Sequence, residues 1–145
     1  YRSMFQGCSS LTTAPELPAT TLENICYNGM FLGCNNLTTT PALPATELAE
    51  GCYYQMFQYC SSLTTAPELP ATDLASSCYS HMFYGCTSLN YIKCLAVNGI
   101  NQNNSTSGWV SGVQTNSGTF VKHPNATSWP TGNNGIPTNW TVEDA

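Results

Sequence analysis

Residues 27–52 read YNGMFLGCNNLTTTPALPATELAEGC, and residues 53–78 read YYQMFQYCSSLTTAPELPATDLASSC. The two stretches match at the tyrosine, the Met-Phe pair, both cysteines, three leucines and both prolines. The same unit fills residues 1–26 and begins again at residue 79. A strict 26-residue period without insertions is typical of a solenoid, in which each coil buries apolar side chains against the next.

Each copy contains the signals of one short helix. A threonine that can cap a helix N-terminus follows each Pro-Ala pair, at Thr20, Thr46 and Thr72. The apolar residues after the first of these have the spacing of one helical face: Leu22, Cys26, Met30 and Phe31. Gly33 and Gly85 stand where such a helix would end.

Each copy also contains a short extended segment, which is residues 11–14 in the first coil. Thr favours strands, and strands of successive coils would pair in parallel. Pro15 and Pro18 cannot donate to that ladder, so the strand is limited to about four residues. The sequence therefore predicts an α/β solenoid, with one short parallel strand and one short helix in each 26-residue coil.

The last copy degenerates after Leu89. We place the repeats in residues 1–97, with coils starting at 1, 27, 53 and 79, and a mainly-β C-terminal cap in residues 98–145. One helical turn is expected at 109–113 and a strand at 118–123. A repeat array needs a cap over its last coil, so the tail aromatics are expected to plug that end; the alternative is a platform for sugar rings. These aromatics are Trp109, Phe120, Trp129 and Trp140.

The recurring M-F-x-G-C-x-S-L-T-T-x-P-x-L-P motif of residues 1 to about 95 resembles the BspA-like leucine-rich repeats of Bacteroidales cell-surface proteins. The resemblance implies a right-handed leucine-rich-repeat-like solenoid that is exposed at the cell surface and used for adhesion or partner binding. Localisation is accordingly expected to be extracellular or at the cell surface.

Charge is scarce, at 8% of residues with a net charge of −5. Three cations cannot form the basic stripe that nucleic acid requires. No apolar run approaches the ~20 residues of a membrane span. The expected partner is a protein or glycan at the cell exterior that tolerates a neutral to acidic surface.

The eight cysteines form two columns at the repeat period and one outlier, Cys94. Three interpretations compete: reduced core thiols, disulfides between the columns, and metal ligands. We favour core thiols, because free Cys is among the most buried residue types, and gaps of 18 and 8 residues do not suit zinc. Cys94 stands in phase with Glu16 and Glu68. Because the repeat gives it no partner cysteine, it is the best candidate for an exposed, reactive thiol.

No catalytic site, metal site or cofactor is expected. His81 lies near two cysteines in sequence, but its slot holds Ser3, Gly29 or Gln55 in other coils, which indicates a surface substitution. Glu16 and Glu68 would lie about 10 Å apart on strands spaced by 4.8 Å, and a solvated acidic pair is the simpler interpretation. The chain is therefore expected not to be an enzyme.

The function expected is a non-catalytic interaction or adhesion module that binds a protein partner through the solenoid face. The alternative is a glycan-binding module that uses exposed tyrosines and the tail tryptophans. Candidate partner-binding residues either face outward on the strands or fill slots that vary between coils: Thr13, Glu16, Thr39, Thr65, Glu68, Tyr54, Tyr59 and Tyr84.

Tyr1 begins in the middle of the pattern, so we expect the chain to be part of a longer array. The apolar edge of the first coil would then be open, and we expect end-to-end self-association through it.

Overall fold

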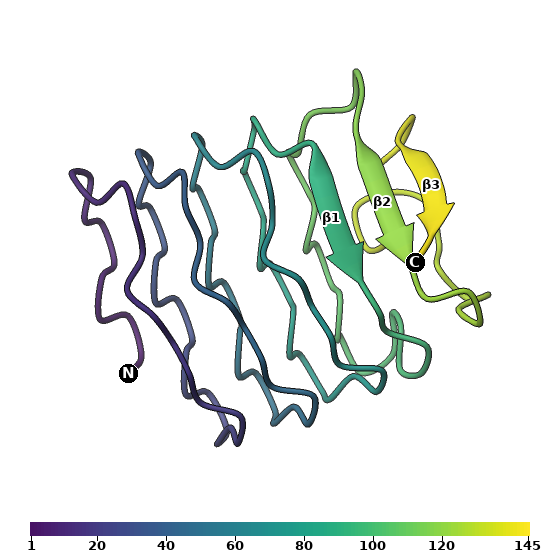
Figure 1. The fold of residues 1–145 in the computed structure, drawn as a ribbon, viewed down its shortest axis with the longest axis horizontal. Coiled ribbons are helices and arrows are strands. Elements are labelled where there is room, and N and C mark those ends of the chain that lie inside the picture. The colour runs from purple at the N-terminus through teal and green to yellow at the C-terminus, as the bar shows by residue number, and fades with distance from the viewer.

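The computed structural model describes residues 1–145 and contains no helix. Its three strands are β1 (Tyr91–Cys94), β2 (Thr119–Lys122) and β3 (Thr141–Asp144). They form one parallel sheet in the order β1-β2-β3, at the C-terminal end of the molecule (Figure 1). The predicted α/β class, with a helix and a strand in every coil, is wrong.

The chain instead winds through stacked, mostly irregular coils (Figure 1). Each coil has two sides. The extended side comprises residues 11–20 and their equivalents, and it continues into β1, β2 and β3. The turn side comprises residues 1–8, 25–34, 51–60, 77–86 and 104–113, which run as consecutive tight turns. The core lies between the two sides.

Backbone hydrogen bonds explain why the turn side is not helical. Alternate N–H groups bond within their own turn, as Met30 N donates to Tyr27 O at 3.2 Å. The N–H groups between them donate to the next coil, as Phe31 N does to Met56 O at 2.9 Å. Every fourth residue has a left-handed backbone, shown by the φ values of 61°, 58° and 75° at Ile25, Gly29 and Gly33. An α-helix tolerates none of these features.

The spacing between coils gives a physical reason for this arrangement. The stacked rings of Phe31 and Phe57 have centroids 5.6 Å apart, and those of Phe57 and Phe83 are 5.9 Å apart. Parallel strands sit about 4.8 Å apart, whereas helices need about 8–10 Å between their axes. A ladder of turns fits the close spacing and bonds to the next coil at the same time.

The core consists of columns of identical side chains. The phenylalanine column begins with Phe5 and the tyrosine column with Tyr1, and each continues at the repeat period. Rings in the tyrosine column are 6.0–6.3 Å apart. Met, Cys and Leu columns beside them are almost fully buried from the second coil onward. This core is what the repeated apolar positions contribute to the fold.

Prolines explain why the extended side forms strands only late in the chain. The expected strand at residues 11–14 is reduced to one isolated bridge, between Thr13 and Thr39. Pro lacks an N–H and therefore cannot donate to the ladder. β1 contains no proline, and it pairs over all four of its residues with β2.

A one-residue change of register corrects the prediction for Cys94. Thr65 pairs with Tyr91, but Leu69 pairs with Cys94, so the offset falls from 26 residues to 25. Because side chains alternate between faces, this slip moves Cys94 from the exposed glutamate slot into the buried leucine column. Cys94 is 0% exposed, and the prediction of an exposed, reactive thiol there is wrong.

The turn ladder also crosses residue 97, where the sequence analysis places a boundary. Phe83 N donates to Trp109 O at 2.8 Å. This donor and acceptor are 26 residues apart in sequence, whereas the equivalent pairs of the earlier coils, such as Phe57 N and Met82 O, are 25 apart. One extra residue therefore enters this coil, and Trp109 takes the slot of the methionine column. The helical turn expected at 109–113 is wrong, because these residues are another copy of the turn side.

Residues 130–137 lie against that last turn segment. Val110 N donates to Asn133 O at 3.2 Å, and the Thr106 hydroxyl donates to Asn134 O at 2.8 Å. The indole N–H of Trp109 donates to Gly135 O at 2.8 Å. These bonds occupy groups that would otherwise face a further coil.

Candidate functional site

The structure divides the predicted partner-binding residues between the two sides of the coils. One group lies on the extended side: Thr13, Glu16, Thr39, Thr65 and Glu68. The other lies on the turn side: Tyr54, Tyr59 and Tyr84. The eight residues therefore cannot form one continuous site.

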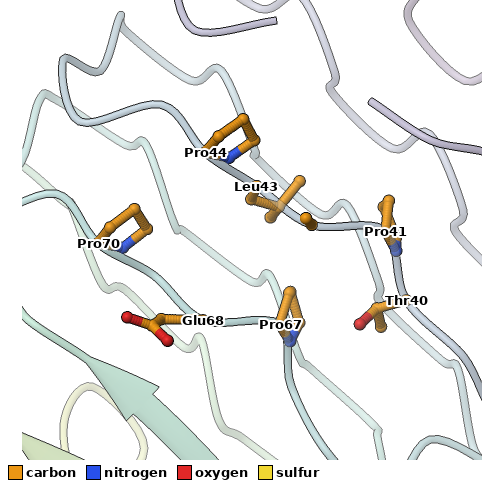
Figure 2. Close-up of a pocket in the computed structure, with 8 residues that line it drawn as sticks. Thr40, Pro41, Leu43, Pro44, Pro67, Glu68 and Pro70 are labelled. Atoms are coloured by element: carbon orange, nitrogen blue, oxygen red, sulfur yellow. The ribbon is translucent and has the colours of Figure 1, made fainter. Parts of the chain in front are cut away.

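The extended side offers two shallow hollows between proline rings. Figure 2 shows the first, of about 420 Å³, between Pro41 and Pro44 of one coil and Pro67 and Pro70 of the next. Glu68 lines it and forms an ion pair with Lys93, with Nζ to Oε1 at 3.4 Å.

The second hollow, of about 360 Å³, lies on the other side of Pro41 and Pro44 and is lined by Glu16. Glu16 and Glu68 thus lie in separate hollows, with Ala42 lining both. Neither hollow contains a histidine, a cysteine or a second carboxylate, so neither has an acid–base pair.

The turn side carries a group of four aromatic side chains, Tyr54, Tyr59, His81 and Tyr84, which we call the aromatic cluster. Tyr54 and His81 have ring centroids 5.8 Å apart, and His81 and Tyr84 are 5.7 Å apart. Tyr59 and Tyr84 are 5.5 Å apart and nearly perpendicular, at 88°. Tyr59 is 51% exposed, and the other three are half-buried.

His81 joins this cluster although the sequence did not single it out for binding. Its ring is oriented by a hydrogen bond between Nδ1 and the Ser80 hydroxyl, at 3.0 Å. One feature of the sequence could have identified His81: its position in the repeat is occupied by different residues in different coils, as are the positions of the three tyrosines. His81 touches no thiol in a hydrogen bond, so the structure contains no Cys–His pair there.

Glycines of the next coil make room for two of the rings. A Cβ on Gly85 would lie 2.5 Å from Tyr59 Cδ1, and one on Gly108 would lie 3.1 Å from His81 Nε2. Tyr59 and His81 themselves have left-handed backbones, with φ of 63° and 54°. Bulky residues avoid this region. Both rings are therefore held against the next coil from strained backbone positions.

Four of the five turn-side segments contain no Asp, Glu, Lys or Arg: residues 25–34, 51–60, 77–86 and 104–113. The segment of the first coil, residues 1–8, carries Arg2. In the four uncharged segments the polar groups are hydroxyls, amides and the His81 imidazole. Depletion of charge together with enrichment in tyrosine is the composition of the centre of a protein–protein interface.

All eight cysteines are free. Cys8 is exposed, Cys26 is half-buried, and the other six are buried. The thiols of Cys34, Cys60 and Cys86 donate to phenylalanine carbonyls of the preceding coil at 3.0–3.2 Å. Burial raises the pKa of Cys86 to about 12, so this thiol stays protonated and unreactive at neutral pH.

The tail tryptophans pack inward. Trp109 is 0% exposed and Trp140 is 7% exposed. Trp109 stacks on Trp129 with ring centroids 5.4 Å apart, and Phe120 packs edge-on against Trp109. These faces are not free to stack on sugars, which leaves the exposed tyrosines as the remaining residues for the glycan alternative.

Two further features bear on the predicted partners. No helix has the length and apolar character that crossing a membrane requires. The edge of the first coil exposes Tyr1 and Met4 to 76% and 53%, beside an apolar hollow of about 470 Å³. End-to-end association through this edge stays a prediction.

No group of three or more His, Cys, Asp or Glu residues could hold a metal ion.

Comparison of the chain with protein-family models, curated proteins and solved structures gives no match.

Proposed function

We propose that the chain is a non-catalytic interaction module that binds a protein partner through the turn side. The observation that carries this proposal is the aromatic cluster, four partly exposed rings on two turn-side segments, residues 51–60 and 77–86, that contain no charged residue. Tyrosine provides a large contact area at a low entropic cost, because its side chain has only two torsions to fix.

The rigid backbone supports the same proposal. Tyr59 N donates to Tyr84 O at 2.7 Å, and His81 N donates to Ser107 O at 2.9 Å. The residues that present the rings are thus fixed within the ladder before any partner arrives. A surface that is already ordered loses little conformational freedom on binding.

A cell-surface location and membership of the BspA-like repeats remain part of the proposal. The repeat motif supports them, and a low-charge surface that binds through hydroxyls, amides and aromatics suits an adhesion module. The absence of an acid–base pair in either hollow supports a binding role over a catalytic one.

The test is a binding screen against purified extracellular proteins and, in parallel, a glycan array. Any protein that binds the wild-type chain is retested with Tyr59→Ala/Tyr84→Ala and with Thr13→Ala/Thr65→Ala on the extended side. We expect the tyrosine variant to weaken binding by about 30-fold, as for an interface hot spot, and the threonine variant to bind normally. Loss of binding only in the threonine variant, or capture of glycans alone, would refute the proposal.

A further inference from the structure

We propose that the aromatic cluster is the subsite for a cationic side chain, arginine or lysine, of the protein partner. This inference rests on the proposed function and names the chemistry of the partner at that site.

The angles between the rings favour a cation over a flat ligand. A platform for a sugar ring needs aromatic faces close to one plane. Here the rings are inclined by 60° between Tyr54 and His81, 39° between His81 and Tyr84, and 88° between Tyr84 and Tyr59. Inclined rings present aromatic faces in more than one direction, which suits a compact cation better than a flat sugar ring.

Charge complementarity points the same way. The chain has a formal net charge of −5, so its field attracts cationic groups. Lys93 and Lys122 are held in ion pairs with Glu68 and Asp144 on the extended side. The turn-side segments that carry the cluster, residues 51–60 and 77–86, contain no cation, and Arg2 lies on the turn side two coils away. The electron-rich ring faces therefore have no cation of the chain beside them.

The cluster is also built at a cost to the backbone. The slot of Tyr59 is occupied by Gly7, Gly33 and Gly85 in the other coils, and glycine suits its left-handed φ of 63°. A tyrosine there buries little in the core, since half of it is exposed. The ring lies against Gly85 and Tyr84 at the outer surface rather than in the core, and strained positions of this kind concentrate at binding sites.

The test measures binding of two peptides to the chain at 150 mM salt. One is acetyl-Gly-Arg-Gly-Arg-Gly-amide, whose blocked termini carry no charge, and the other is the same peptide with citrulline in place of arginine. Citrulline has nearly the shape of arginine but carries no charge. NMR ring-proton shifts are followed for Tyr54, His81 and Tyr84. We expect the arginine peptide to bind with a Kd of about 1–10 mM, and the citrulline peptide to bind at least tenfold more weakly.

Two matched pairs of variants locate the effect. His81→Phe keeps an aromatic wall and should retain binding, whereas His81→Arg fills the cluster with its own cation and should abolish it. Gly85→Ala displaces the Tyr59 ring and should weaken binding several-fold. Gly33→Ala has the same strain, with φ of 75° against 72°, but its added Cβ would have no neighbour closer than 3.8 Å, so it should bind normally.

The inference is overturned if the arginine and citrulline peptides bind equally well, or if the NMR shifts change only for residues outside the cluster. It is also overturned if choline binds and arginine does not. So would undiminished binding to His81→Arg that melts at the wild-type temperature. If a protein partner loses affinity with Tyr59→Ala/Tyr84→Ala but is unaffected by His81→Arg, the inference fails and the proposed function stands. If neither variant weakens the partner, the proposed function fails as well.

Discussion

Raising the pH from 7.5 to 10 should destabilise this protein strongly, because of its buried thiols. Burial raises the pKa of Cys78, Cys86 and Cys94 from an ordinary 9.0 to about 12, and it raises the pKa of Cys52 and Cys60 further still. In the unfolded chain these thiols ionise near pH 9, whereas in the folded chain they keep their protons. The unfolded state is therefore favoured as the pH rises above 9.

The size of the effect follows from the proton balance. At pH 10, a thiol that ionises only in the unfolded state shifts the equilibrium by about 1.4 kcal/mol. The five most deeply buried thiols together remove about 7 kcal/mol, which is comparable to the whole stability of many domains, about 5–15 kcal/mol. Below pH 8 the same thiols are protonated in both states and contribute almost nothing.

Urea unfolding at pH 7.5, 9 and 10 in the presence of a phosphine reductant measures the effect. Tryptophan fluorescence reports the transition, because Trp109 is fully buried and Trp140 is 7% exposed in the folded chain. Cys86→Ala should lose about 1.4 kcal/mol less than wild type between pH 7.5 and 10, since it has one fewer thiol to protect. Cys8→Ala, at an exposed site, should follow the wild-type pH dependence. The reasoning is refuted if the free energy of unfolding is the same at pH 7.5 and pH 10.

Three further predictions follow from burial and backbone geometry. At pH 7.5, a maleimide should label Cys8 first in the native protein and Cys94 only after unfolding. Mass spectrometry of peptides identifies the labelled cysteines, and early labelling of Cys94 would contradict the register of β1. Phe57→Ala, which removes a fully buried ring from the middle of its column, should cost about 3–5 kcal/mol in urea unfolding, and a loss below about 1.5 kcal/mol would argue against the stacked core. Ile25→Asn should stabilise the chain by about 1 kcal/mol in the same assay, because Ile25 is 46% exposed and has a left-handed φ of 61° that asparagine tolerates. A loss of stability would show that the part of the Ile25 side chain that is buried matters more than the backbone strain.

The sequence identified the columns of the core but not the backbone that carries them. Apolar residues spaced by four, such as Leu22, Cys26 and Met30, suit one face of a helix. The turn ladder repeats its backbone every four residues as well, as the left-handed positions at 25, 29 and 33 show. Both structures therefore produce the same spacing, and hydrophobic periodicity cannot separate them. Gly29 and Gly33 inside the expected helix were the available warning, because glycine suits left-handed positions.

The position of Cys94 could not be predicted by counting at the repeat period. The shift of register lies between Thr65 and Leu69, and it becomes visible only from which residues pair across the coils. A single residue is enough to exchange the exposed and buried faces of an extended segment. The extra residue before Trp109 has the same consequence on the turn side, where it places an indole in a methionine slot.

Three of the four members of the aromatic cluster were predicted from the sequence, but His81 and the assembly of the cluster were not. Tyr54, Tyr59 and Tyr84 stood out as variable slots within a fixed framework. Their proximity depends on hydrogen bonds that join a residue to one 25 positions later, as Tyr59 N joins Tyr84 O. A period of 26 in the sequence does not reveal that offset of 25 in contacts, so His81 could not be placed between Tyr54 and Tyr84.

The left-handed slots also explain how such a surface can vary without unstacking the coils. Their N–H groups donate to the next coil whatever the side chain, as Gly29 N donates to Tyr54 O and Gln55 N to Ser80 O. The ladder therefore depends on the backbone at these slots, and a substitution there mainly changes local strain and the outer surface. Two of the three left-handed slots in the second coil hold glycine, at Gly29 and Gly33, and so carry no side chain. In the next two coils one of the equivalent slots holds an aromatic ring, Tyr59 and His81, which places both rings of the proposed binding surface on that part of the turn side.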